Sequence, residues 1–199
     1  GGGGPWYFDP PAAADFPDTY SGDANNLTLT DDTDVGLIFA STLNATGNIQ
    51  RLATKSLPSA GATAWTVTIH GRWNWPATTG GSFNLSIYES ATGKVAHIGW
   101  LSGGNIQAWR GANLTSFTAN IGSAFGRSIT DYWFRISYDG STTYTMSYSA
   151  DGKNWIATGT VPATTAFTTR ADKVGIGMQS AANTGAPCAL SIDCWQQSW

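Results

Sequence analysis

The side chains best suited to chemistry in this chain are aromatic and amide groups rather than ionisable ones. Ten tryptophans occur among 199 residues, whereas charged residues make up only 12%. A Trp ring stacks on the apolar face of a pyranose and also offers an N–H donor. Trp100, Trp109 and Trp133 each fall on the opposite side of a predicted strand from apolar neighbours. We therefore expect these three rings to face away from the core.

If their strands neighbour one another, the three tryptophans share one sheet face with polar partners. Such a face, with several amides and one Arg, suits neutral or mildly acidic sugars. Core packing or a subunit interface is the alternative, because a bulge exchanges the two faces of a strand. For Trp65, Trp73, Trp75 and Trp155 we expect the core. The candidate glycan-binding residues are Trp100, Trp109, Trp133, Arg135, Tyr88, Asn105 and Gln107.

Clustered catalytic carboxylates are not recognisable in the sequence. Glycosidases use two carboxyl groups that face each other across the scissile bond. The chain has a single glutamate, Glu89, which we expect at a solvated strand end. The acidic turn DDTD, residues 31–34, lacks the spacing and glycine of an EF-hand loop, so a solvated turn is favoured over a calcium site. We expect no enzymatic activity, no catalytic residue, no metal and no cofactor.

The two cysteines lie six residues apart in the stretch PCALSIDCW. In a strand this spacing separates them by about 20 Å, whereas a disulfide needs Cα atoms within about 7 Å of each other. Cys188 and Cys194 share parity with Leu190 and Ile192, so we expect two buried free thiols that point into the core. Free thiols are typical of proteins that fold in a reducing cytosol.

Two-residue periodicity dominates from residue 63 onward and predicts strands. In ATAWTVTIHGRW and FNLSIYE the inward positions are 65, 67 and 69, and 83, 85 and 87. The steps Asp139-Gly140 and Asp151-Gly152 predict hairpin turns. No ten-residue stretch has a helical period. We therefore expect an all-β protein, an antiparallel β-sandwich of roughly a dozen strands.

The N-terminal segment differs in composition from the rest of the chain. Residues 1–24 are rich in Gly, Pro and Ala, and their prolines exclude a helix interior. We interpret them as an extended N-terminal arm for attachment or packing, followed by a single β-sandwich domain over residues 25–199. The arm's assembly candidates are Trp6, Tyr7 and Phe8, because exposed aromatics pack either on their own domain or on a neighbouring subunit.

Residues 131–155, DYWFRISYDGSTTYTMSYSADGKNW, resemble the concanavalin A-like lectin/glucanase superfamily, as do the later stretches DKVGIGMQS and ALSIDCW. The resemblance covers residues 63–199 and implies a jelly-roll sandwich, a fold that hosts lectins, hydrolases and adhesion modules. The stretch SGDANNLTLTDDTDVGLIF resembles the N-terminal segments of bacteriophage virion proteins such as fibres, spikes and head decorations. The calcium-loop pattern of legume lectins is not recognisable.

These patterns predict a non-enzymatic bacteriophage virion structural protein, such as a fibre, spike or capsid decoration, whose sandwich binds host-surface polysaccharide. The alternative is a carbohydrate-binding module or glycanase-like domain of a bacterial polysaccharide-degrading enzyme. We expect contacts with other virion subunits of the capsid or tail through the arm, a homo-oligomer, and assembly in the bacterial host cytoplasm. Nucleic acid is not an expected partner, because the net charge is −3 and no basic cluster exists. No apolar run reaches the about 20 residues that span a membrane.

Overall fold

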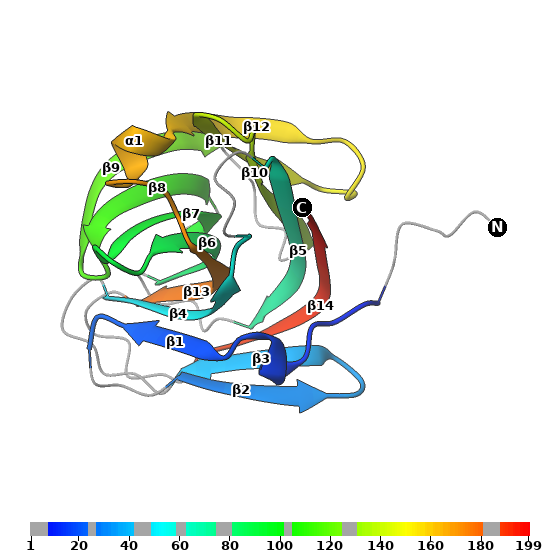
Figure 1. Ribbon diagram of the computed structural model, residues 1–199. Coiled ribbons are helices and arrows are strands. Elements are labelled where there is room, and N and C mark those ends of the chain that lie inside the picture. The colour runs from blue at the N-terminus through cyan, green and yellow to red at the C-terminus, as the bar shows by residue number, and fades with distance from the viewer. Residues whose placement is uncertain are drawn as a thin grey trace.

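In the computed structural model the chain forms two antiparallel β-sheets that pack face to face (Figure 1). The structure describes residues 8–23, 27–41, 49–58, 63–74, 81–101, 105–124, 131–180 and 188–199. The predicted fold class, an antiparallel β-sandwich of jelly-roll type, is confirmed. No helix among the described residues is long and apolar enough to span a membrane.

Within the described residues each sheet has seven strands. Sheet I has the order β1 (Asp18–Ser21), β4 (Ile49–Ser56), β13 (Lys173–Ser180), β6 (Gly81–Glu89), β7 (Lys94–Leu101), β8 (Asn105–Asn113) and β9 (Ser116–Ala124). Sheet II has the order β12 (Ile156–Pro162), β11 (Thr143–Ser149), β10 (Asp131–Tyr138), β5 (Trp65–Asn74), β14 (Cys188–Ser198), β3 (Gly36–Ser41) and β2 (Leu27–Asp32). The short helices are the 3-10 helix η1 (Ala13–Asp15) and α1 (Ala163–Ala166).

Strand alternation builds the core between the two sheets. The predicted inward positions of β5 and β6 are all buried, with Val67, Ile69, Leu85 and Ile87 at 0% exposure. Trp65 also lies in this core. Burying such side chains stabilises the fold by about 1.5–3 kcal/mol each. These inward faces were predictable because polar residues separate the apolar ones at every second position.

Two hairpins of sheet II form at the predicted Asp-Gly steps. Gly140 has φ 81° and Gly152 has φ 70°, a left-handed conformation that glycine adopts without a Cβ clash. The carboxylates of Asp139 and Asp151 each accept hydrogen bonds from backbone N–H groups of their own turns. These bonds lower the pKa of both aspartates. The turns thereby fix the pairing of β10 with β11 and of β11 with β12.

Part of the predicted arm packs on the sandwich. Strand β1 pairs with β4 and forms one edge of sheet I. Phe16 is 3% exposed, and its ring centroid lies 5.0 Å from that of Trp195. Asp9 exchanges backbone hydrogen bonds with β14. Of the predicted assembly residues, Phe8 is exposed, whereas Trp6 and Tyr7 lie outside the described residues.

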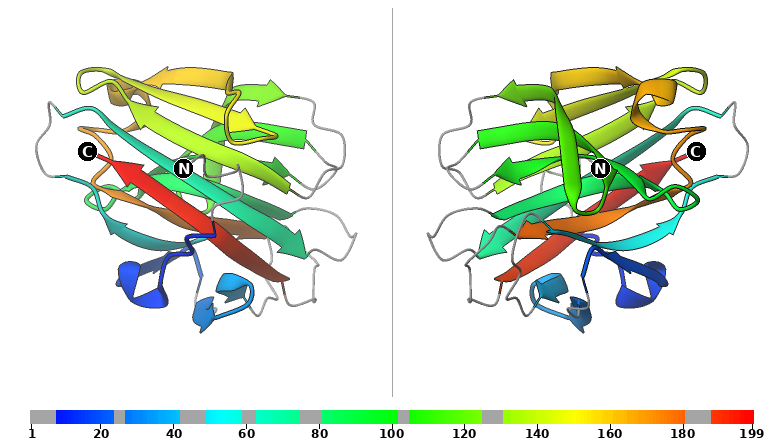
Figure 2. Two further views of the ribbon diagram at one scale, coloured as in Figure 1. Left: turned by 90° about the vertical axis from the view of Figure 1, so that its right-hand side faces the viewer. Right: turned by 90° about the vertical axis from the view of Figure 1, so that its left-hand side faces the viewer.

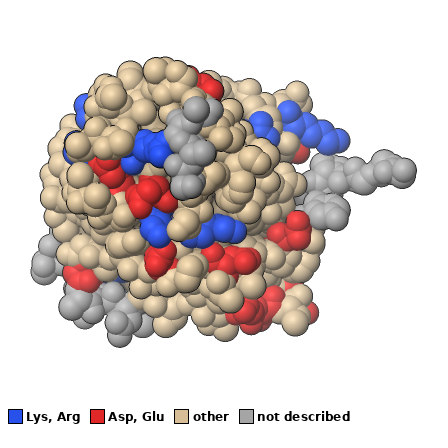
Figure 3. Space-filling model, in the orientation of Figure 1, with Lys and Arg blue, Asp and Glu red and all other residues tan. Residues whose placement is uncertain are grey.

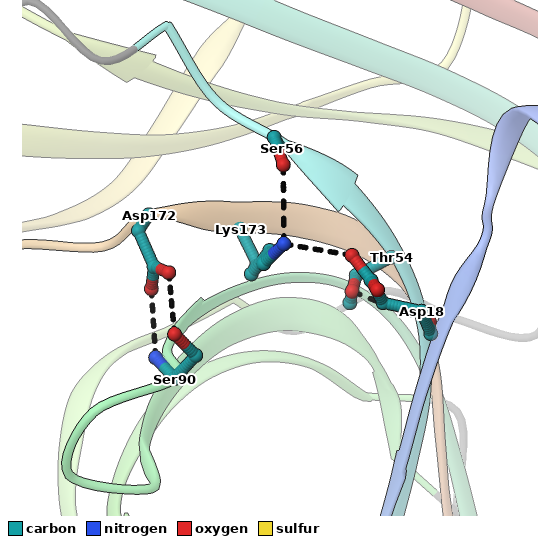
Figure 4. Close-up of polar contacts among 6 residues, drawn as sticks. All are labelled: Asp18, Thr54, Ser56, Ser90, Asp172 and Lys173. Atoms are coloured by element: carbon teal, nitrogen blue, oxygen red, sulfur yellow. Dashed lines mark hydrogen bonds and ion pairs between the residues drawn. The ribbon is translucent and has the colours of Figure 1, made fainter.

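Lys173 fastens β1 to the rest of sheet I (Figure 4). Its Nζ lies 2.7 Å from a carboxylate oxygen of Asp18 and donates to Ser56 Oγ at 3.1 Å. The hydrogen bond to Asp18 raises the pKa of Lys173. Beside this pair, Asp172 accepts hydrogen bonds from the backbone N–H and the hydroxyl of Ser90. Charges of both signs are interspersed on this side of the molecule, and most of its surface is uncharged (Figure 3).

Cys194 is buried, but the predicted direction of its side chain is wrong. The register of β14 against β5 shifts between Ile192 and Cys194, and this bulge exchanges the two faces of the strand. Cys194 therefore pairs with His70 on the outer side of sheet II. Burial raises the pKa of its free thiol to about 12, so the thiol stays protonated and unreactive. The side chain of Cys188 lies outside the described residues.

Candidate functional site

The outer face of sheet I, which points away from the core, carries polar side chains that the strand register aligns in rows. Paired residues of neighbouring strands point to the same side of a sheet. From β6 through β7 and β8 to β9, one row holds Ser86, His97, Trp109 and Asn120, and the next holds Asn84, Gly99, Gln107 and Ser123.

One half of this face is a buried polar network. Gln50, Asn84 and Ser86 are all 0% exposed. Gln50 Nε2 and Ser86 Oγ each donate to Asn84 Oδ1 at 2.6 Å, and Asn84 Nδ2 donates to Ser82 Oγ at 3.2 Å. The sequence offered a signal for this network, because Asn84 and Ser86 stand at every second position of FNLSIYE, but Gln50 gave none.

The tip of the β8–β9 hairpin covers this network. Register shifts at three places bend the hairpin, and its tip reaches across to β4, where the Gln50 N–H donates to the Leu114 carbonyl at 2.8 Å. Leu114 then packs with Leu52, Tyr88 and Val95 in a second, smaller apolar cluster. Figure 2, right, looks onto this side of the molecule, with the hairpin in green nearest the viewer.

The other half of the face stays open to solvent. Asn105, Gln107 and Trp109 of β8 are half-buried, and Asn120 and Ser123 of β9 are exposed. We call these five residues the β8–β9 ledge. Trp109 Nε1 donates to Gln107 Oε1 at 2.6 Å, which fixes the orientation of the indole ring. The ledge therefore presents one oriented aromatic ring among amide and hydroxyl groups, the side-chain types that bind saccharides.

The structure brings together only part of the predicted glycan-binding set. Trp109, Asn105 and Gln107 share the ledge as expected. Tyr88 lies on the same face but is 6% exposed beneath the hairpin tip. The prediction for Trp100 is wrong, because its ring lies in the core, 4.9 Å from that of Tyr132.

Trp133 and Arg135 face away from the core as predicted, but they do not share a face with Trp109. Their strand, β10, pairs with β5 and β11 and therefore belongs to sheet II. Trp133 is 6% exposed and lies 4.6 Å from the His70 ring. Trp155, predicted in the core, is instead half-buried beneath Arg135 on this outer side. The side chain of Trp73 and all of Trp75 lie outside the described residues.

His97 is the one ionisable side chain in the two polar rows. It is 3% exposed beneath Phe117, whose ring centroid lies 5.4 Å away, and its Nδ1 has no hydrogen-bond partner among the described residues. Burial lowers the pKa of His97 to about 3, so the imidazole is neutral at pH 7. A buried nitrogen without a partner is costly. In the row, His97 stands between Ser86 and Trp109.

Glu89 is not the solvated residue that the sequence predicts. It is 4% exposed, and its carboxylate accepts hydrogen bonds from the backbone N–H groups of residues 168–170 and from the Thr92 hydroxyl. Burial alone would raise the pKa of Glu89, but these hydrogen bonds outweigh it and lower the pKa. The only glutamate of the chain thus anchors the loop after α1.

The DDTD turn is stabilised by hydrogen bonds within the turn. The Asp32 carboxylate accepts from the backbone N–H groups of Asp34 and Val35.

No protein-family model and no curated protein matches the chain. Solved structures do match it. An alginate lyase of polysaccharide lyase family 7 has a TM-score of 0.54 at 13% identity, over 85% of this chain and 82% of the lyase. The carbohydrate binding module CBM66 from Bacillus subtilis has a TM-score of 0.50 at 10% identity, over 87% of this chain and 92% of the module.

A GH43 protein from Bacillus licheniformis matches with a TM-score of 0.55 at 11% identity, over 87% of this chain. This chain spans about a third, 32%, of the length of that protein. The fold is concanavalin A-like. At these identities the likeness defines the fold alone, and this fold carries both binding modules and enzymes.

Proposed function

We propose that the protein is a non-catalytic carbohydrate-recognition module that binds a saccharide on the β8–β9 ledge. The observation that carries the proposal is the Trp109 ring, which Gln107 holds in place among Asn105, Asn120 and Ser123. A fixed ring lowers the entropy that binding costs, because the side chain is already ordered before the sugar arrives. The fold likeness to a carbohydrate binding module supports the same function.

The distribution of carboxylates favours binding over hydrolysis. Among the described residues of β6 to β9, no Asp or Glu lies on the outer face of sheet I. Glu89 is occupied as a loop anchor, and Asp18 is paired with Lys173. Hydrolysis of a glycosidic bond by two carboxyl groups would require both to reach the same sugar. A glycanase-like domain is the alternative, and an assay for released sugar distinguishes it from a binding module.

Replacing Trp109 by Ala should weaken saccharide binding by about 30-fold, which corresponds to about 2 kcal/mol of lost ring contact. Calorimetric titration with a panel of bacterial surface polysaccharides would measure this loss. The matched control is Trp199→Ala, which removes an indole that is 45% exposed at the C-terminus and off the ledge. We expect the control to bind as the unchanged protein does.

The same titrations, assayed for newly released reducing ends, separate binding from catalysis. Saturable binding without release supports the recognition module. Release of reducing ends by both the unchanged protein and the control Trp199→Ala would support the glycanase-like alternative. If no polysaccharide binds, or if both Trp variants lose affinity equally, the ledge is not a saccharide site.

We further propose that this module is a subunit of a bacteriophage particle. The support is the resemblance of residues 21–39 to virion proteins, together with the exposed apolar side chains of Phe8, Val35 and Trp199, which suit assembly contacts. Mass-spectrometric detection of the protein at a fixed copy number in purified particles is the expected result. A strictly monomeric protein that is absent from particles would contradict this setting.

A further inference from the structure

The outer face of sheet II carries a row of hydroxyl groups that the strand register aligns. One residue from each of five neighbouring strands contributes, and all five are partly or fully exposed. Adjacent strands lie about 4.8 Å apart, so the row has a regular spacing close to the length of one sugar unit. Thr66 Oγ1 donates to Ser137 Oγ at 3.1 Å within it. From β14 to β12 the row is Ser198, Thr66, Ser137, Thr145 and Thr160. Figure 2, left, looks onto these strands.

Arg135 stands beside this row, two residues before Ser137 on β10. Its guanidinium carbon lies 3.6 Å from the centroid of the Trp155 ring, and its Nε donates to Thr68 Oγ1 at 3.1 Å. The Trp155 ring thus contacts one flat face of the guanidinium, and Thr68 accepts from Nε. The N–H donors of the two terminal nitrogens, Nη1 and Nη2, take part in neither contact. These donors have the geometry that binds both oxygens of a carboxylate.

Arg135 is half-buried, yet no described residue forms an ion pair with it. A partly buried charge is usually paired, because desolvation without a partner is unfavourable. Burial accordingly lowers the pKa of Arg135. Arg72 provides the contrast on the same sheet face. It is 65% exposed and still lies 3.8 Å from the Asp193 carboxylate. The more buried of the two arginines is thus the one without an acidic partner among the described residues.

We propose that the outer face of sheet II binds an acidic saccharide, whose carboxylate pairs with Arg135 and whose hydroxyls contact the row at Thr66, Ser137 and Thr145. The charge of Arg135 selects for uronic-acid units, and the stacked Trp155 ring keeps the guanidinium fork oriented before the ligand arrives. This site lies on the opposite side of the sandwich from the β8–β9 ledge and does not rest on the function proposed for the ledge.

Calorimetric titration of the full chain with an oligogalacturonate, and with a neutral oligogalactan of equal length, tests the proposal. We expect saturable binding of the acidic oligomer and at least tenfold weaker binding of the neutral one. Arg135→Gln should weaken binding of the acidic oligomer at least tenfold. Arg135→Lys keeps the positive charge but loses the planar fork and the donor to Thr68, and it should also lose tenfold or more.

Arg72→Gln is the matched control, because it removes one positive charge from the same face. We expect its affinity to stay within twofold of the unchanged protein. Equal losses in Arg72→Gln and Arg135→Gln would overturn the proposal in favour of non-specific electrostatic attraction. Full affinity in Arg135→Lys, if its melting temperature is unchanged, would overturn the bidentate geometry. If neither the unchanged protein nor the Trp109→Ala variant binds the oligogalacturonate, the proposed site on sheet II is overturned. The proposal for the β8–β9 ledge is then unaffected.

Discussion

Lowering the pH from 7 to 4 should destabilise the protein by about 3 kcal/mol through His97 alone. In the folded chain burial lowers the pKa of His97 to about 3, whereas an unfolded chain has an ordinary His pKa of about 6.5. Below pH 6.5 the unfolded state therefore binds a proton that the folded state rejects. The stability is fully present above pH 6.5 and is lost progressively as the pH falls towards 3.

Urea unfolding of the unchanged protein and of His97→Leu, at one-unit steps from pH 7 to pH 4, checks this prediction. Leu retains the bulk of the buried ring and removes both the titration and the nitrogen without a partner. We expect the variant to be at least as stable as the unchanged protein at pH 7, because that nitrogen is gone, and to lose less stability on acidification. A residual loss is expected from Glu89, whose lowered pKa also ties stability to higher pH. Parallel pH profiles for the two proteins would show that His97 does not titrate as proposed.

The fold was largely predictable because alternation and turn chemistry act locally. The core faces of β5 and β6 follow from every second residue, and the two Asp-Gly turns follow from the backbone freedom of glycine. The direction of Cys194 was not predictable in the same way. One extra residue in β14, Asp193, exchanges the faces of the strand, and nothing in the local sequence marks such a bulge.

The direction of the candidate site's side chains was predictable in strands whose apolar residues all face the core. In β8, Ile106 and Ala108 are core residues, so Gln107 and Trp109 were assigned to the correct side. In β7 the same reasoning failed, because Val95 is buried on the outer face by the β8–β9 hairpin. Because Val95 is apolar, its side of β7 was predicted to face the core. Trp100, on the opposite side of the strand, was therefore predicted to face outward.

Long-range pairing was the second limit of the sequence. Arg135 and Trp133 were placed correctly outward on β10, but alternation says nothing about which sheet a strand joins. Their separation from Trp109 divides one predicted binding face into two surfaces on opposite sides of the sandwich. The burial of Glu89 depends on a loop some 80 residues later in the chain, with Glu89 and Arg170 81 positions apart, so no local pattern could reveal it.

Gly99→Ala should destabilise the protein by about 3 kcal/mol or more and lower its melting temperature by about 10 °C. A Cβ at this position would overlap the Phe83 carbonyl oxygen and lie 2.6 Å from the Asn84 Cα. Both atoms belong to the backbone of β6, so no rotamer change relieves the overlap. Strands β6 and β7 would have to separate beneath Asn84 and Gln107, next to the proposed saccharide site.

Gly93→Ala is the control for this substitution, measured by thermal unfolding beside Gly99→Ala. Gly93 has φ 80°, but a Cβ there meets nothing closer than 3.9 Å. Its cost is therefore the left-handed backbone penalty alone, about 1 kcal/mol. The two variants separate the two causes of destabilisation. Gly93→Ala is destabilised only by the left-handed backbone conformation, and Gly99→Ala only by the overlap with β6. A Gly99→Ala protein no less stable than Gly93→Ala would mean that β6 and β7 can shift apart freely, and the ledge would then lack the rigid support on which an oriented Trp109 depends.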